Sequence, residues 1–257
     1  LIGMSAGIGT MIGPVMGGGL AFIHPLFPMY FGALIAVFGG FLAMKYLKES
    51  TIEKVKIEKS SLKFYDKRIF PFLFGWCIAF LVFTGTQVIA AFFIEDRLGV
   101  IGQNEIIKAT SIALLSMALT TTLMQAVVLQ IFNISFQTLL RICFVIFGTV
   151  LLSITLVQDL WHLYLAFSGI GIAFSMMTPG LNAGATLSVE THEQGEVAGL
   201  LAAAPVLGMI FGPPLGAFLY NLDTTYPFYY GGIVVLTLGV YFQFIKFPKD
   251  IHSKLDV

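Results

Sequence analysis

The chain has 257 residues, of which 57% are hydrophobic and only 11% are charged, and its mean hydropathy is +0.90. A soluble domain of this length has too little interior to bury so much apolar surface, so the composition indicates an integral membrane protein. The net charge of zero argues against nucleic-acid binding, which requires a concentrated excess of Lys and Arg on one face.

The apolar stretches predict an all-α membrane protein. They run well beyond the roughly ten residues of a barrel strand and lack strict alternation, so the spanning elements are helices. Eight transmembrane helices are expected, at about residues 1–22, 26–47, 69–94, 106–131, 138–157, 161–189, 195–220 and 227–247.

One long polar stretch, residues 48–67, separates the first two helices from the remaining six. Alternating sides through the eight helices puts twelve of the fourteen Lys and Arg on the side of this stretch, with only Arg97 and Lys108 opposite. The positive-inside rule therefore predicts that residues 48–67 and the C-terminus are cytoplasmic. The twelve are Lys45, Lys48, Lys54, Lys56, Lys59, Lys63, Lys67, Arg68, Arg141, Lys246, Lys249 and Lys254.

A glycine-proline motif occurs twice, as GTMIGPVMG at residues 9–17 and as GMIFGPPLG at residues 208–216. Eight identities at a constant offset of 199 fall in the 24 positions from 9 to 32, whereas roughly two are expected by chance in so apolar a chain. We interpret this as an internal duplication. The shared motif residues are Gly9, Gly13, Pro14 and Gly17, and Gly208, Gly212, Pro213 and Gly216.

The duplication predicts the organisation of a larger protein. The second copy lies in the fifth helix after the polar stretch, so the first copy is expected in the fifth helix of an earlier bundle, with about 130 residues and four helices missing from the N-terminus. Residues 1–47 then form the last two helices of an N-terminal bundle, and 48–67 form a linker. Residues 68–250 form a six-helix bundle, and 251–257 form a tail.

Each glycine stripe lies on one helix face at four-residue spacing, which lets a neighbouring backbone approach, and each proline permits a kink. A plain packing face is common in membrane proteins. Two copies in corresponding helices of a repeat favour a transporter, because alternating-access transporters are built from such repeats.

The residues GIGTMIGPVMGG at 7–18 resemble the GxxxGPxxGG pattern in the fifth helix of drug:proton antiporters of the major facilitator superfamily. Residues 176–220, with Pro179, the turn EQGEVAGL and the second motif, are similar to helices ten and eleven of its tetracycline-efflux type. In this family's layout the chain holds helices five to twelve, although the loop 130–141 keeps only Arg141 of the family's basic pattern.

The resemblance implies two six-helix bundles with a mid-membrane cavity, and multidrug or tetracycline resistance by efflux across a cell membrane, in bacteria the inner membrane. The implied partners are a small hydrophobic or amphiphilic substrate, protons as the coupling ion, the bilayer and the missing helices. It also implies that the glycine-proline helices lie along the seam between the two bundles.

Uncharged polar residues within the spans are candidates for lining the cavity, because a buried amide in lipid is costly without a partner or a water-filled space. Interhelical hydrogen bonding is the alternative role for each. Soft apolar side chains at Phe83 and Met124 would complete an adaptable wall. The polar candidates are Thr84, Gln87, Thr121, Gln125 and Asn182.

No Asp, Glu, Lys or Arg is expected near the middle of any span, so proton coupling is predicted to reside in the missing helices or at the membrane edges. A membrane-embedded enzyme would need a nucleophile with a base, carboxylates or metal ligands within reach, and the spans offer none. A channel would need a polar pore stripe. No cofactor is expected, and Cys77 and Cys143 count as small hydrophobic residues. An importer or a metabolite exporter of the same superfamily remains the alternative.

Overall fold

The computed structural model describes residues 26–46, 62–125 and 134–245, together with Met16, Leu20 and His24. The chain divides into two compact units, Leu1–Ser61 and Leu62–Val257. Within the described residues, seven helices are long and apolar enough to cross a membrane. The expected all-α membrane architecture is confirmed.

The first unit contains helix α2, Phe27–Tyr46, with Lys45 in its last turn. This helix matches the prediction for residues 26–47. The helix predicted over residues 1–22 lies outside the described residues except at Met16 and Leu20, both of which are helical.

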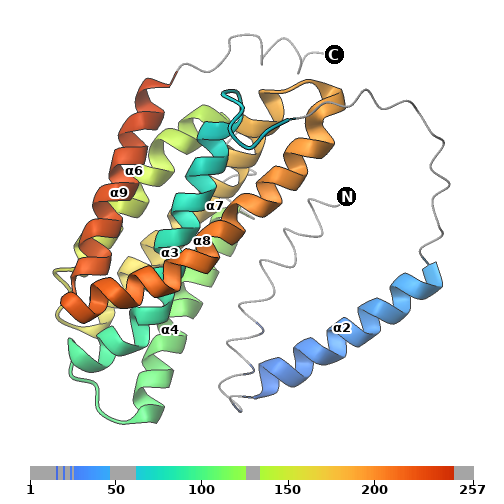
Figure 1. The fold of residues 1–257 in the computed structure, drawn as a ribbon. Helices are drawn as coiled ribbons and strands as arrows, with labels where there is room; N and C mark the ends of the chain where they lie inside the picture. Colours follow the sequence, from blue (N-terminus) through green and yellow to red (C-terminus); the bar gives the residue numbers. More distant parts are fainter. Residues whose placement is uncertain are drawn as a thin grey trace. The chain divides into compact units, whose positions relative to one another are not determined.

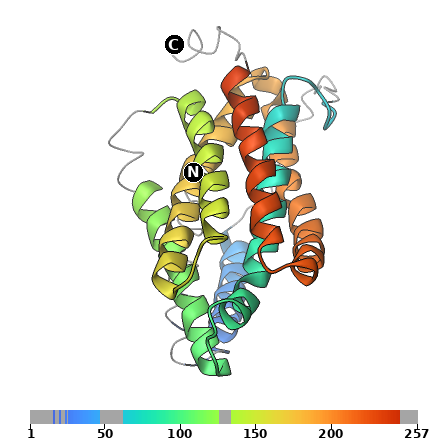
Figure 2. The same ribbon diagram turned by 90° about the vertical axis from the view of Figure 1, so that its left-hand side faces the viewer.

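The second unit is a bundle of six long helices that run side by side (Figure 1, Figure 2). Helices α4 and α6 begin three and two residues before the predicted positions 106 and 138, and a π-helical turn at residues 124–125 follows α4. The elements are α3 (Phe70–Asp96), α4 (Gln103–Leu123), α6 (Phe136–Ile154), α7 (Leu160–Leu187), the 3₁₀ turn η2 (Thr191–Glu193), α8 (Gln194–Leu222) and α9 (Tyr226–Phe244).

The helix starts follow from local sequence. Ser135 precedes α6 and accepts a hydrogen bond from the backbone N–H of Thr138, and Asp159 does the same for His162 at the start of α7. Proline stands in the first turn of both α3 and α9, where a backbone N–H would have no helical partner. Gly102, with φ of 100°, turns the chain into α4 in a conformation that other residues rarely adopt.

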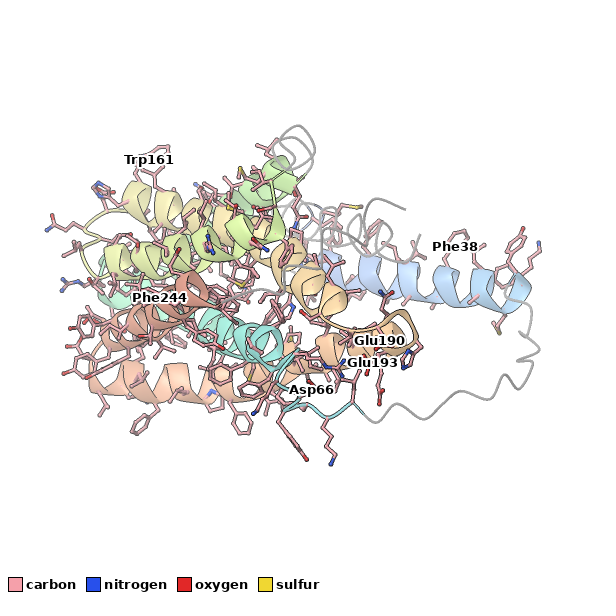
Figure 3. All side chains as sticks on the ribbon, turned by 90° about the horizontal axis from the view of Figure 1, so that it is seen from above. Phe38, Asp66, Trp161, Glu190, Glu193 and Phe244 are labelled. Carbon is pink, nitrogen blue, oxygen red and sulfur yellow. The ribbon has the colours of Figure 1, made fainter. Side chains whose placement is uncertain are left out.

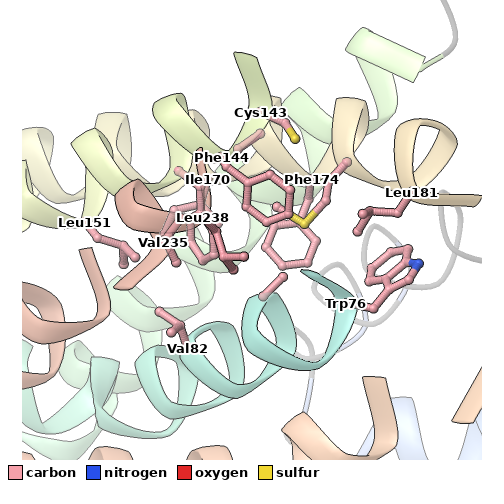
Figure 4. Packing of buried hydrophobic residues seen from close by; sticks show 14 of the residues in the cluster. Trp76, Val82, Cys143, Phe144, Leu151, Ile170, Phe174, Leu181, Val235 and Leu238 are labelled. Atoms are coloured by element: carbon pink, nitrogen blue, oxygen red, sulfur yellow. The ribbon is translucent and has the colours of Figure 1, made fainter. Parts of the chain in front are cut away.

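Aromatic side chains and close backbone contacts fill the bundle's interior (Figure 4). The rings of Phe144 and Phe242 stack at 5.1 Å between α6 and α9, and Phe93 meets Phe228 edge-on at 4.9 Å between α3 and α9. A Cβ added to Gly148 would lie 2.9 Å from the carbonyl oxygen of Gly232, so α6 and α9 approach at their backbones. This is how helices associate when lipid supplies no hydrophobic driving force between them.

Part of the polar stretch belongs to the second unit, which begins at Leu62 and not at the residue 68 chosen from the sequence. Leu62 is 9% exposed and Ile69 is fully buried. Two apolar side chains thus anchor residues 62–69 on the bundle.

Candidate functional site

The second glycine-proline motif forms the face of α8 that contacts α3. Gly208, Gly212 and Gly216 are buried, whereas Pro213 is half-buried. The first motif, Gly9, Gly13, Pro14 and Gly17, lies outside the described residues.

The contact along this face is between backbones. A Cβ on Gly216 would lie 2.8 Å from the Cα of Gly85, and one on Gly212 would overlap the carbonyl oxygen of Leu81 and the hydroxyl of Thr84. Thr84 itself donates to Phe80 O at 2.7 Å and to Gly208 O at 3.4 Å. The glycines therefore serve packing inside the second unit, and Thr84 lies in this α3–α8 contact as an interhelical donor.

An ion-pair cluster closes one end of the α3–α8 pair (Figure 3). The two terminal guanidinium nitrogens of Arg68 donate to both carboxylate oxygens of Glu193, at 2.9 and 3.0 Å, and Nη2 also donates to Asp66 at 3.0 Å. Hydrogen bonds with Asp66, and then with Glu193, raise the pKa of Arg68 above its ordinary value. The side-chain and backbone donors of Arg68 lower the pKa of the Asp66 carboxyl.

The same Glu193 caps the turn before α8. Its carboxylate accepts the backbone N–H of Glu190 at 3.0 Å, and the Glu190 side chain accepts the N–H of Glu193 in return. The capping box thus spans Glu190 to Glu193. Glu193 thus combines capping with the ion pair.

A second bond joins α3 and α8 at their other ends. The phenolic O–H of Tyr220 donates to the carboxylate of Asp96 at 2.8 Å. Helices α3 and α8 are therefore fixed at both ends, with the glycine contact between them.

Hydroxyl groups join α4 to α7. Ser116 donates to Tyr164 O at 3.1 Å, Thr120 to Ser168 O at 3.0 Å, and Thr121 to Gly171 O at 3.1 Å. Each also bonds a carbonyl of its own helix. Thr121, a predicted cavity residue, thus acts between helices, and Ser116 and Thr120 are partners that the sequence analysis missed.

An aromatic row runs along one face of α3 against α7. Phe83 lies 4.5 Å from Phe174 and 5.9 Å from Phe80, measured between ring centroids, and Phe80 lies 5.4 Å from Trp76. The indole N–H of Trp76 donates to the amide oxygen of Asn182 at 3.1 Å. Trp76 is only 6% exposed, whereas Asn182 is exposed. Figure 4 shows Phe174 within the core and Trp76 beside Leu181.

The two glutamines stand apart from these contacts. Gln87 follows Phe83 by four residues on the same face of α3, is half-buried, and makes no hydrogen bond with another described residue. Gln125 and Met124 lie half-buried in the π-helical turn after α4. The structure therefore gathers Phe83, Gln87 and Asn182 around the aromatic row and places Gln125 and Met124 on another helix.

Charged residues in the described spans stay near helix ends. The deepest, Lys108 and Arg141, are each the sixth residue of their helix. The middle of the described spans offers uncharged groups, namely aromatic, aliphatic, sulfur, hydroxyl and amide side chains, an arrangement suited to binding an apolar or amphiphilic molecule.

A family profile decides between the classes of membrane protein considered so far. The profile of the Major Facilitator Superfamily matches residues 109–255, more than half of the chain. The chain belongs to this superfamily. Major Facilitator Superfamily proteins are transporters, so it is not an enzyme.

Two relatives come from Bacillus subtilis (strain 168). The chain is 28% identical over 249 residues to "Multidrug resistance protein 1" and 25% identical over 253 residues to "Multidrug resistance protein 2". These alignments cover 92% and 91% of this chain, but 61% and 60% of the relatives. The chain thus spans about three fifths of the length of these two relatives.

Proposed function

We propose that the chain takes part in proton-coupled efflux of a hydrophobic or amphiphilic, drug-like compound by alternating access. The observation that carries the proposal is the aromatic row of α3 and α7 with an amide at each end, Gln87 and Asn182, in a chain of this superfamily. The printed names of the two relatives support a drug as the substrate.

The chemistry of the row fits such a substrate. Ring faces attract flat and cationic groups, and a half-buried amide such as Gln87 supplies a donor and an acceptor that can orient the ligand. The row lies on one bundle, so alternating access requires a second bundle on the opposite side of the substrate. In this proposal α3 and α8 move together, because their ends are bonded and their backbones are in contact.

The orientation and the coupling ion are parts of the same proposal. The lysine-rich end of the second unit, where Lys63, Lys67 and Arg68 precede α3, faces the cytoplasm. Protons are taken up by carboxylates at the membrane edges or outside the described residues, since the described charges lie near helix ends.

The test is ethidium efflux from cells that lack their main drug pumps and express this chain together with the second bundle that alternating access requires. We expect efflux that a protonophore abolishes, that Phe83→Ala slows several-fold, and that Phe92→Ala leaves unchanged. Phe92 is a matched control because it is an exposed phenylalanine of the same helix outside the row. Unchanged ethidium efflux in Phe83→Ala would show that the aromatic row does not bind the substrate.

The alternative is an importer or a metabolite exporter of the same superfamily. Cells expressing the gene would then retain ethidium at the level of the empty vector while still accumulating or losing some other solute. Ethidium efflux that a protonophore does not abolish would instead support a drug as the substrate and refute protons as the coupling ion.

A further inference from the structure

An apolar groove lies between α3 and α9 on the outside of the bundle. Helices α8 and α9 are joined at residues 223–225 and diverge from there, as Figure 1 shows, so α3 is uncovered between them. Near the joined ends all three helices line a small pocket of about 90 Å³. Toward the lysine-rich end only α3 and α9 line the groove, which widens to about 480 Å³, and Val234 borders both parts.

The walls of the wide part are almost entirely apolar and run along the helix axes. On the α3 side the rings of Phe70 and Phe74 stack, with their centroids 5.6 Å apart. On the α9 side Ile233, Thr237 and Tyr241 follow one another at intervals of about one helical turn. A long, narrow apolar groove parallel to the membrane normal has the shape of an extended acyl chain. Bilayer lipid is as apolar as the groove, so preference for one lipid must come from its headgroup.

Lys67 lies in the turn that leads into α3, three residues before Phe70 of the groove wall. The backbone N–H groups of Ile69 and Phe70 both donate to Asp66 O, at 3.0 and 2.8 Å, so residues 66–70 form a helical turn that continues into α3. Lys67 therefore precedes Phe70, Phe74 and Ile78 by three, seven and eleven residues and lies on the groove face.

The charge of Lys67 is available to a ligand. Arg68, its neighbour, is held by Asp66 and Glu193, whereas Lys67 is exposed and has no acidic partner among the residues described. A lysine side chain at a membrane interface extends its ammonium toward the headgroups. Anionic phospholipids are attracted to such basic residues next to a spanning helix.

We propose that the α3–α9 groove binds one acyl chain of an anionic phospholipid whose phosphate contacts the ammonium of Lys67. The walls hold the chain and Lys67 selects the headgroup. The site is separate from the aromatic row of Trp76, Phe80 and Phe83 and does not depend on which substrate is transported.

The test is native mass spectrometry of the purified protein after incubation with equal amounts of phosphatidylglycerol and phosphatidylethanolamine that carry the same acyl chains. We expect the protein to retain phosphatidylglycerol several-fold over phosphatidylethanolamine. Lys67→Gln should reduce this ratio to about one, whereas Lys108→Gln, which changes an exposed lysine at the other end of the bundle, should leave it unchanged.

A second pair of variants tests the walls. Thr237→Trp fills the groove from an exposed position, whereas Val240→Trp adds the same bulk on α9 outside it. Thr237→Trp should retain neither lipid, whereas Val240→Trp should retain both. Equal melting temperatures of the two variants would show that both fold. Equal retention of the two lipids by the unmodified protein, an unchanged ratio in Lys67→Gln, or full retention in Thr237→Trp would overturn the proposal. Displacement of the lipid by ethidium would do so too, because the groove would then be a substrate site.

Discussion

The contact between α3 and α8 predicts opposite effects for two glycine-to-alanine substitutions in the same helix. A Cβ on Gly212 would overlap Leu81 O and Thr84 Oγ1, and would lie 3.2 Å from the backbone nitrogen of Gly85. Two of these three atoms belong to the backbone, so the helices must separate. A Cβ on Gly199 would meet nothing within 4 Å.

The magnitude follows from two opposing contributions. Replacing glycine by alanine inside a helix stabilises it by about 0.5–1 kcal/mol, and this is the whole effect expected at Gly199. Overpacking at a tight contact costs about 1–3 kcal/mol, and the blocked backbone at Gly212 puts that site at the upper end. The net loss for Gly212→Ala is therefore about 1–2 kcal/mol, whereas Gly199→Ala gains up to about 1 kcal/mol.

The assay is thermal unfolding of both variants in the same detergent. A change of 1 kcal/mol moves the melting temperature by about 2–4 °C in a protein of this size, so Gly212→Ala should melt about 2–8 °C lower and Gly199→Ala slightly higher than the unmodified protein. Equal melting temperatures for the two variants would show that α3 and α8 do not meet at their backbones, and would refute the packing described above.

Three further predictions concern polar contacts of the second unit. Thr121→Val should lower the free energy of unfolding by about 0.6–1.7 kcal/mol, the range for interhelical hydrogen bonds in membranes, whereas Thr149→Val should not, since that hydroxyl bonds only its own helix. Equilibrium unfolding of the two variants measures the difference. Glu193→Gln should lower the melting temperature and speed proteolysis before α3, with exposed Glu196→Gln as the control, and equal proteolysis rates would contradict the ion pair. The hydrogen bonds of Arg68 lower the pKa of the Asp66 carboxyl from 3.8. The contribution of this carboxylate to the free energy of unfolding should therefore be complete above about pH 4 and be lost as the pH falls below that value. An acid titration of Asp66→Asn should lack this loss.

The architecture of the chain could be predicted from its sequence because the membrane imposes strong rules. A span must be long, apolar and helical, so hydropathy located all seven described helices to within a few residues at most ends. The largest differences among the described residues are three positions, at the start of α4, where Gly102 turns the chain, and at the ends of α6 and α9.

The partners of individual side chains were much less predictable. Glycine spacing indicated a close contact on α8, but it did not indicate α3 as the neighbour, because the direction of a stripe depends on how the bundle is assembled. Ser116 and Thr120 carried a usable signal, since they are four residues apart on one face with Thr121 beside them. The Arg68–Glu193 pair joins residues 125 positions apart, and no local pattern encodes such a contact.

The candidate site was predicted in part. Gln87, Phe83 and Asn182 were chosen as uncharged polar or aromatic residues within spans, and the structure gathers them around one aromatic row. Trp76 is buried and donates to Asn182, because an indole N–H in an apolar bundle needs an acceptor. A role in substrate binding stays a prediction for all of these residues.

Drug binding at the aromatic row can be measured with Trp76 itself. The chain has only two tryptophans, and the other, Trp161, is exposed at the far end of α7, so Trp161→Phe leaves Trp76 as the sole reporter. Titration of this variant with ethidium should change the Trp76 fluorescence to saturation, and adding Gln87→Leu should weaken the apparent affinity. Fluorescence that stays constant while the same preparation binds ethidium would contradict the account, since the drug would then bind away from the α3–α7 row.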